Sequence, residues 1–316
     1  MVRFVLTRIA LLVVGLAVAS ILIFLTLRVL PGDVAQVIGG TQASPAQVAA
    51  LRSELGLDRP IWVQYGEWIG GVARLDLGRS LVTQTPVAGQ LGQKLEVTLP
   101  LAGLSLLLGL VIGVPLGVVS ALRHRTVGGF ILSAAAQTVA AVPVVFAGVL
   151  LIVLLALTLK LLPTQGFPLD GWHEPGRSLQ ALILPALTIA LVEGAVILRF
   201  TRSAALDALG QDYVRTAAAK GMTTTRALIT HGLPNVLLSV VSVIGVQIAG
   251  LIVGAVIVEQ LFQLPGVGRM LVSDVGNRDL TKVQSELLAL TALILVVGTA
   301  VDIVHRLVDP RERERA

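Results

Sequence analysis

The chain has 316 residues, of which 55% are hydrophobic and only 14% are charged, and its mean hydropathy is +0.87. This composition excludes a soluble globular domain and indicates a membrane protein. The formal net charge of +5 comes from basic residues spread around predicted helix ends, without a basic patch interleaved with aromatic residues, so nucleic acid is excluded as a partner. The absence of cysteine excludes disulfides and thiolate metal sites.

Apolar runs long enough to cross a bilayer, which takes about 20 mostly apolar residues, recur along the chain. Each is predicted to be a helix, because a span in hydrocarbon has to satisfy its own backbone hydrogen bonds. Six spans are predicted, at residues 9–30, 98–122, 131–159, 180–198, 236–258 and 285–305. The predicted layout is a single domain over residues 1–316, with the first span within 1–30, an external loop at 31–97 and a five-span core at 98–316.

The first run has an alternative interpretation as a cleaved signal peptide. Arg3 and Arg8 precede it, and residues 17–19 (Ala-Val-Ala) resemble a signal-peptidase site. The apolar stretch continues to Val29, which is longer than the usual h-region, so the run is expected to be an anchor.

The external loop is expected to contain local structure. A helix with a serine cap is predicted over residues 45–55, with Gly56 as its stop. Trp62, Tyr65 and Trp68 could sit at the membrane interface, where amphipathic rings are favoured. A small packed cap without direct ligand contact is the favoured interpretation of the loop.

Basic residues in short loops predict the orientation. They lie before the first run, in the turns after the second and fourth runs, and after the sixth. Both termini are therefore predicted to be cytoplasmic.

Strongly polar residues are rare within the predicted spans, where they are expensive and become functional candidates. Gln137, Glu193 and Gln247 are the candidates. For Glu193 the interpretations that stay open are an ion pair with Arg199, a pairing with another subunit, or a place on a polar path through the membrane.

Glycines recur every fourth residue in two predicted spans, as Gly109, Gly113 and Gly117 in one and Gly250 and Gly254 in another. Small residues on one helical face let helices approach closely. Static packing is favoured, with a sliding or gating face as the alternative.

A polar insert, DYVRTAAAKGMTTTRALITHGLPN, separates the fourth and fifth runs from Asp212 to Asn235. Asp212 is the predicted N-cap of a helix of about eight residues, and Gly221 its predicted stop, because glycine accepts the left-handed conformation that ends helices. Thr223 or Thr224 is expected to cap a second short helix that Pro234 limits.

The first helix of the insert carries three alanines beside Arg215 and Lys220. Such a small-residue face lets the backbone of another protein come close, so the insert is interpreted as a docking surface. An ordinary solvated loop helix is the alternative.

Motifs for catalysis are missing from the sequence. There is no P-loop with Lys-Ser or Lys-Thr, no HExxH and no GxSxG, and the four histidines are far apart. The chain is therefore not expected to hydrolyse ATP or to act as an enzyme.

The spacing in the insert resembles the EAA loop of the inner-membrane subunits of bacterial ABC importers, in which a glycine is followed nine residues later by a hydrophobic residue, any residue, and Leu-Pro. Here nine residues separate Gly221 from residues 231–234, His-Gly-Leu-Pro. Arg215 and Thr216 replace the usual Glu-Ala, and His231 replaces the hydrophobic residue. The sequence YVRTAAAKG, at residues 213–221, is similar to the corresponding segment in the dipeptide, oligopeptide and nickel branch of that family.

Other segments resemble the same branch. Residues 30–33 (Leu-Pro-Gly-Asp), 55–60 and 75–80 look like its long first external loop, and residues 309–311 resemble its ending. Residues 259–269 are similar to its E-x-x-F-x-x-P-G-x-G segment, where a helix end, a Pro-Gly turn and a restart are expected. Glu259 in this segment is expected to line the substrate entrance or to reach water.

The resemblance implies an all-α membrane protein with six transmembrane helices and the type I ABC importer permease fold. Implied partners are a second, similar permease subunit, two cytoplasmic ATPase subunits that bind ATP and Mg²⁺, an extracytoplasmic peptide-binding protein and the lipid bilayer. The chain itself would hold no cofactor, and its location would be the bacterial inner membrane. Short peptides are the implied cargo, with nickel chelates or glutathione as alternatives.

A secondary transporter or channel is the alternative from another class, but it would more typically show ionisable groups or broken helices inside the spans. The coupling residues implied for the insert are Asp212, Tyr213, Arg215, Ala217, Ala218, Lys220, Gly221, His231 and Pro234. The candidates for the substrate path or its gate are Gln137, Glu193, Gln247 and Glu259.

Overall fold

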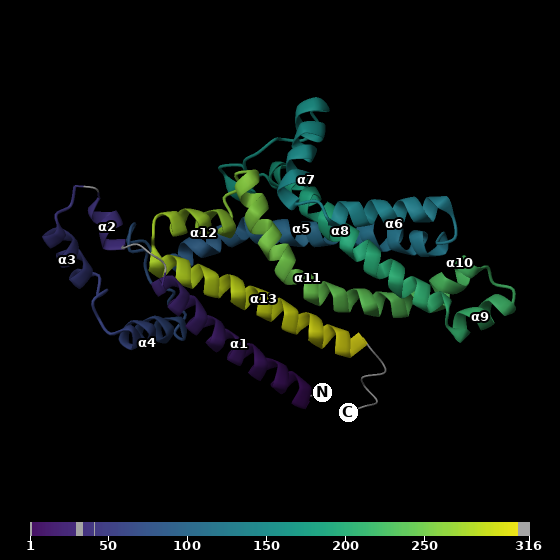
Figure 1. The fold of residues 1–316 in the computed structure, drawn as a ribbon, viewed down its shortest axis with the longest axis horizontal. Coiled ribbons are helices and arrows are strands. Elements are labelled where there is room, and N and C mark those ends of the chain that lie inside the picture. The colour runs from purple at the N-terminus through teal and green to yellow at the C-terminus, as the bar shows by residue number, and fades with distance from the viewer. Residues whose placement is uncertain (1, 30–33, 41, 309–316) are drawn as a thin grey trace. The chain divides into compact units, whose positions relative to one another are not determined.

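The computed structural model describes residues 2–29, 34–40 and 42–308, and the regular structure of that part is helical apart from one isolated β-bridge (Figure 1). The predicted all-α class is confirmed. The segments 30–33 and 309–311, which carry part of the family resemblance, lie outside the described residues.

The described residues divide into two compact units, a core unit within 99–264 and 297–316 and a flank unit within 2–98 and 265–296. The flank unit contains α1 (Val2–Val29), α2 (Val34–Gly39), α3 (Pro45–Glu54), α4 (Ile61–Val72), α12 (Val267–Gly276) and the first parts of α5 (Val87–Leu122) and α13 (Leu280–Val308). The core unit contains the rest of α5 and α13 with α6 (Val127–Ala140), α7 (Val144–Leu151), η1 (Ile152–Thr158), η2 (Gly171–His173), α8 (Pro175–Leu209), α9 (Asp212–Ala219), α10 (Thr224–Ala227), η3 (Leu228–Gly232) and α11 (Leu233–Leu261).

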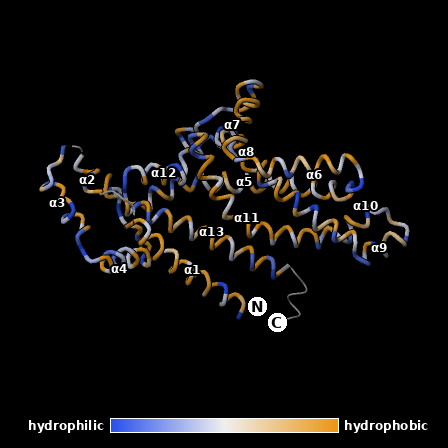
Figure 2. Tube along the Cα trace, viewed as in Figure 1, coloured by the Kyte–Doolittle hydropathy of each residue, from blue (hydrophilic) through white to orange (hydrophobic). Residues whose placement is uncertain are grey.

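Five helical segments of the described chain are long and apolar enough to cross a membrane, namely α1, α5, α8, the segment Thr224–Leu261 and α13. Hydrophobic residues run along all of them, as Figure 2 shows in orange. By length and composition, these segments confirm the predicted spans at 9–30, 98–122, 180–198, 236–258 and 285–305.

The predicted span at 131–159 is wrong as one straight helix. α6 ends at Ala140, α7 begins at Val144, and the two are bent by 107°. Pro143 lies at this bend, where it has no N–H to donate and its ring disfavours the helical conformation of the residue before it. The described chain has six spans only if this bent pair counts as one.

The central helix of the core unit is α8, which contacts α6, α7 and α11. The glycine repeat of α5 packs on α8. A Cβ atom added at Gly113 would lie 2.6 Å from the carbonyl oxygen of Gly194, and one at Gly117 would lie 2.6 Å from the Cβ of Thr201. These glycines therefore allow a backbone approach that any larger residue would prevent.

In the flank unit, α4 packs against α1 and α13. Trp68 is buried between Phe24 and Leu288 and donates its indole N–H to Ser285 Oγ at 3.1 Å, and the Tyr65 hydroxyl lies 2.9 Å from Ser20 Oγ. Both rings are therefore held by packing and hydrogen bonds inside the unit, as expected for a small packed cap. Trp62 is exposed.

The local predictions for the external loop and the segment after α11 are confirmed. Ser44 caps α3 through a reciprocal pair of hydrogen bonds with Gln47, and Gly56 has a positive φ of +69°. The α11 helix ends at Leu261 and α12 begins at Val267, as the Pro-Gly turn predicts.

Candidate functional site

The polar insert begins with α9, which has the predicted length of eight residues. Its predicted N-cap is wrong by one position. Gln211 is the capping residue, because its carbonyl already accepts the Arg215 N–H at 3.1 Å, and Asp212 is the first helical residue. The Asp212 carboxylate lies 3.7 Å from the Arg215 guanidinium, and since both side chains are exposed the pair adds little stability.

The two short helices of the insert meet at Gly221, as predicted. Gly221 has φ +94°, a conformation that side chains with a Cβ rarely adopt. Thr223 then caps α10, accepting the Arg226 N–H at 3.3 Å. The stop and the restart are therefore produced by local backbone chemistry.

The predicted end of the second helix at Pro234 is wrong. The α10 helix continues through the π-helical turn η3 into α11 without a break, and the Leu233 N–H bonds to the Leu228 carbonyl, five residues back. Pro234 lies in the first turn of α11, where a missing N–H is tolerated. The coupling candidates are thus continuous in backbone with a predicted membrane span.

Ala217 points into the insert and not outward as expected. It is only 7% exposed and packs with Val214 and Ala227 in a small core that Tyr213 and other apolar residues complete. Residues three apart share one side of a helix, so Val214 and Ala217 face α10 together. The insert is therefore a two-helix unit with a core of its own.

The outward surface of the insert is basic. Arg215, Lys220, Gly221 and Arg226 are exposed, and Ala218 is half-buried beside them. These five residues are called the docking face below. The other two candidates, His231 and Pro234, are exposed on the turn that leads into α11.

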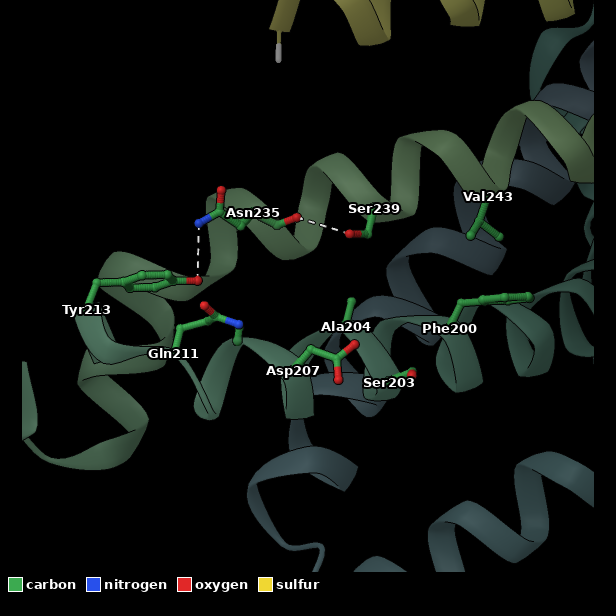
Figure 3. A pocket seen from close by; sticks show the side chains of 10 residues that line it. Phe200, Ser203, Ala204, Asp207, Gln211, Tyr213, Asn235, Ser239 and Val243 are labelled. Atoms are coloured by element: carbon green, nitrogen blue, oxygen red, sulfur yellow. Dashed lines mark hydrogen bonds between the residues drawn. The ribbon is translucent and has the colours of Figure 1, made fainter. Parts of the chain in front are cut away.

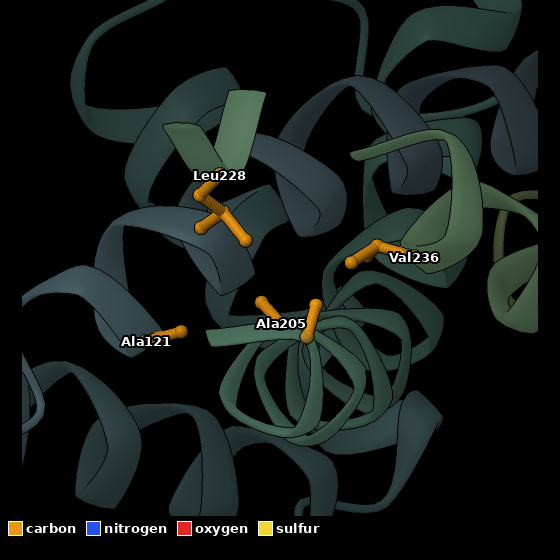
Figure 4. Packing of buried hydrophobic residues seen from close by; sticks show 5 residues of the cluster. Ala121, Ala205, Leu228 and Val236 are labelled. Carbon is orange, nitrogen blue, oxygen red and sulfur yellow. The ribbon is translucent and has the colours of Figure 1, made fainter. Parts of the chain in front are cut away.

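The insert is joined to the ends of the membrane helices by a second apolar cluster (Figure 4). Leu228 of η3 and Val236 of α11 pack against Ala205 of α8 and Ala121 of α5, and Leu228 and Ala205 are completely buried. The insert and the ends of α5, α8 and α11 therefore share one close-packed apolar cluster.

A cavity of about 330 Å³ lies between α8 and α11 at the root of the insert. Asn235 Nδ2 donates to the Tyr213 hydroxyl at 3.2 Å on one side of it, and Figure 3 shows the Asp207 and Gln211 side chains on the other. The Tyr213 side chain is half-buried, and the hydrogen bond to its hydroxyl connects the start of α9 to the start of α11.

Glu193 and Gln247, both path candidates, are brought together within the core unit. Gln247 Nε2 donates to Glu193 Oε2 at 2.6 Å across the contact between α8 and α11. The alternative partner Arg199 is instead stacked near the Phe200 ring. A Cβ added at Gly250 would lie 3.4 Å from Glu193 Oε1, so this glycine leaves room for the carboxylate.

The other two path candidates lie elsewhere. Gln137 is exposed on α6. Glu259 is completely buried near the end of α11, so the expectation that it reaches water is wrong. The four candidates therefore do not form one cluster.

Several residues of the site were missed by sequence reasoning. Asp207, Ser203 and Ser239 line the cavity in Figure 3, and Asn235 closes it. Their only sequence signal is a polar residue every three or four positions at the ends of two apolar helices, which also describes an ordinary solvated helix end.

Comparisons with known proteins match the whole length of the chain. Residues 113–314 match the family described as binding-protein-dependent transport system inner membrane component, and residues 1–102 match the N-terminal family of the same membrane component. The dipeptide transport system permease protein DppB of Escherichia coli K12 is 34% identical over 338 residues, covering 100% of both chains.

Two further relatives have similar names. A Brucella abortus protein named "Putative peptide transport system permease protein" is 39% identical over 314 residues, covering 99% of both chains. A Sinorhizobium fredii protein named "Probable peptide ABC transporter permease protein" is 38% identical over 313 residues, covering 98% of this chain and 99% of the relative.

Proposed function

This chain belongs to the family of binding-protein-dependent transport system inner membrane components, and we propose that it is the permease subunit of an ATP-driven importer of short peptides. The similarity to a dipeptide permease over the full length supports this cargo class. In this proposal, partner subunits hydrolyse ATP, and this chain needs no cofactor of its own.

The observation that carries the proposal is the continuity between the insert and the membrane helices. The docking face lies on a two-helix unit whose core is closed by Ala217, and Leu228 and Val236 pack this unit onto α8. A cytoplasmic ATPase subunit bound to the docking face would therefore move the ends of α8 and α11 together.

The partners follow from this arrangement and from the family. Two ATPase subunits bind ATP and Mg²⁺, one for this permease and one for a second, similar permease. An extracytoplasmic binding protein delivers the peptide. The complex lies in the bacterial cytoplasmic membrane with both termini of this chain inside, which the basic residues of the short loops support.

The substrate path is proposed to be a hydrated cavity between the two permease subunits, because a peptide carries polar backbone groups and charged termini that lipid does not solvate. The hydrogen-bonded pair of Glu193 and Gln247 is the candidate polar contact along it, since both side chains are only partly buried within this chain.

Reconstitution of the complete complex into liposomes tests the proposal. ATP-dependent uptake of labelled di- to octapeptides is expected, and this chain alone should transport nothing. Nickel chelates and glutathione serve as competitors. Uptake of nickel without peptide would contradict the cargo but not the importer class, whereas peptide uptake by this subunit alone would contradict both.

A further inference from the structure

The flank unit contains a second cavity, of about 310 Å³, between the last turn of α1, α4 and the start of α13. This volume lies at the lower end of the range of about 300–1,000 Å³ that ligand sites occupy. With both termini inside, the end of α1 and the start of α13 face the extracytoplasmic side. The polar residues that line the cavity include Arg28, Glu54, Arg59, Glu67, Asp76 and Gln284.

Arg28 is the cation of this cavity that an anionic ligand could use. Its guanidinium carbon lies 5.0 Å from the centre of the Phe24 ring, and the side chain is half-buried. No ion pair joins Arg28 to a carboxylate anywhere in the described ranges 2–29, 34–40 and 42–308. A guanidinium stacked on an aromatic ring keeps its N–H groups at the edge, where they can bind a carboxylate through two hydrogen bonds.

Among the other charged side chains of the cavity, carboxylates outnumber guanidinium groups. Arg59 and Glu67 neutralise each other at 2.6 Å. Asp76 accepts the backbone N–H of Gly78 at 2.9 Å, and Glu54 is exposed at the rim. Because Arg59 and Glu67 are paired with each other, a ligand would meet one guanidinium, that of Arg28, and two carboxylates, those of Asp76 and Glu54.

Neutral groups complete the lining. Gln284 is only 5% exposed yet contributes to the wall, so a polar amide is held there by the fold. Trp68, 8% exposed, adds an apolar surface. The combination of both charge signs, an amide and an aromatic surface is complementary to a small zwitterion with a polar backbone.

We propose that this cavity binds a short peptide through its two free termini, with the α-carboxylate on Arg28 and the α-ammonium on the side of Asp76 and Glu54. The choice of a peptide rests on the proposed function and on the orientation given above. The cavity would thus hold cargo on the outer side of the permease, separately from the binding protein.

The test measures equilibrium binding of labelled trialanine to the complete transporter in nanodiscs, without the binding protein. Trialanine is expected to bind, and trialanine amide to bind about ten- to a hundredfold more weakly, the usual effect of losing a charge-assisted hydrogen bond. Arg28→Gln should weaken trialanine binding by a similar factor, and the amide should then show no further loss, because both changes remove the same contact.

Matched variants control for folding. Arg52→Gln removes a guanidinium that pairs with Asp58 and does not line the cavity, so it should leave binding unchanged. Arg28→Lys keeps the charge without the two-pronged geometry and should restore part of the affinity even if Arg28→Gln assembles poorly. Equal binding of trialanine and its amide to the unaltered complex would overturn the proposal.

Three other outcomes separate this inference from the proposed function. If the complex with its binding protein imports trialanine but binds none without it, the cavity proposal fails and the importer proposal stands. If Arg28→Gln weakens only the affinity of the binding protein for the complex, the cavity serves a docking protein and the peptide site is refuted. If the complex imports no peptide at all, the proposed cargo fails independently of the cavity.

Discussion

Asn235 donates a hydrogen bond to the Tyr213 hydroxyl at 3.2 Å, which joins the first turns of α9 and α11, 22 residues apart in the chain. The bond closes the insert at its root, on the wall of the cavity between α8 and α11 (Figure 3). It therefore couples the position of α9 to the helix that runs through the membrane.

Removing this hydrogen bond should loosen the insert without unfolding the protein. Tyr213→Phe is expected to cost about 1 kcal/mol in local stability and to speed amide hydrogen exchange in α9. Peptide-stimulated ATP hydrolysis by the complex should fall. Ser239→Ala is the control, because the Ser239 hydroxyl donates within its own helix, to the Asn235 carbonyl. Equal exchange rates in Tyr213→Phe and the unaltered chain would contradict the role of the bond.

Substitutions at neighbouring alanines should have opposite outcomes. Ala217→Glu places a carboxylate in the core of the insert and is expected to destabilise it by about 1–3 kcal/mol or more, with loss of cross-linking to the ATPase subunit. Ala219→Glu changes an exposed residue of the same helix and should keep the fold of the insert. Thermal unfolding and cross-linking of both variants check this, and equal stability would show that the burial of Ala217 has no energetic consequence.

Gly221 is expected to tolerate no β-branched residue. Gly221→Val should cost on the order of 1–3 kcal/mol because of the positive φ, although a Cβ would meet no atom within 4 Å. ATP-driven transport should fall while membrane insertion is unchanged. Gly128→Ala, at a helical glycine without positive φ, should be neutral or slightly stabilising. Full transport by Gly221→Val would show that the angle between α9 and α10 is irrelevant to coupling.

Glu193 and Gln247 should behave as a pair. Glu193→Leu leaves the Gln247 amide without its partner and is expected to cost about 1–3 kcal/mol of stability. The exchange Glu193→Gln with Gln247→Glu restores one carboxylate and one amide and should recover most of the loss. Unfolding of the purified permease pair measures both. An exchanged variant as unstable as Glu193→Leu would mean that the two side chains do not depend on each other.

The predicted topology is tested by reporter fusions. Fusions after Arg125 and Arg226 should read cytoplasmic, and fusions near Ser80, Pro175 and Asp274 should read external, because positive charge is retained on the cytoplasmic side. An external reading at Arg226 would contradict the orientation and remove the docking face from the ATPase subunits.

Sequence reasoning located the membrane helices and the local structure of the insert because both depend on short-range chemistry. A span is recognised from the length of its apolar run, and Gly221 and Thr223 act through their own backbone and nearest neighbours. The effects of Pro143, at the bend between α6 and α7, and of Pro234, inside the first turn of α11, were harder to predict. A proline either breaks a helix or is accommodated in it, according to the hydrogen bonds available around it.

The sequence by itself determined the class of the fold, the order of its elements and, through motif spacing, the family. Tertiary structure alone decided that Ala217 is buried while Ala219 is exposed, because helical periodicity separates the faces of α9 without saying which one meets α10. It also decided that Glu193 pairs with Gln247, 54 residues away, and not with Arg199. Partners across two helices depend on their rotation and axial position, which packing of side chains such as those in Figure 4 sets.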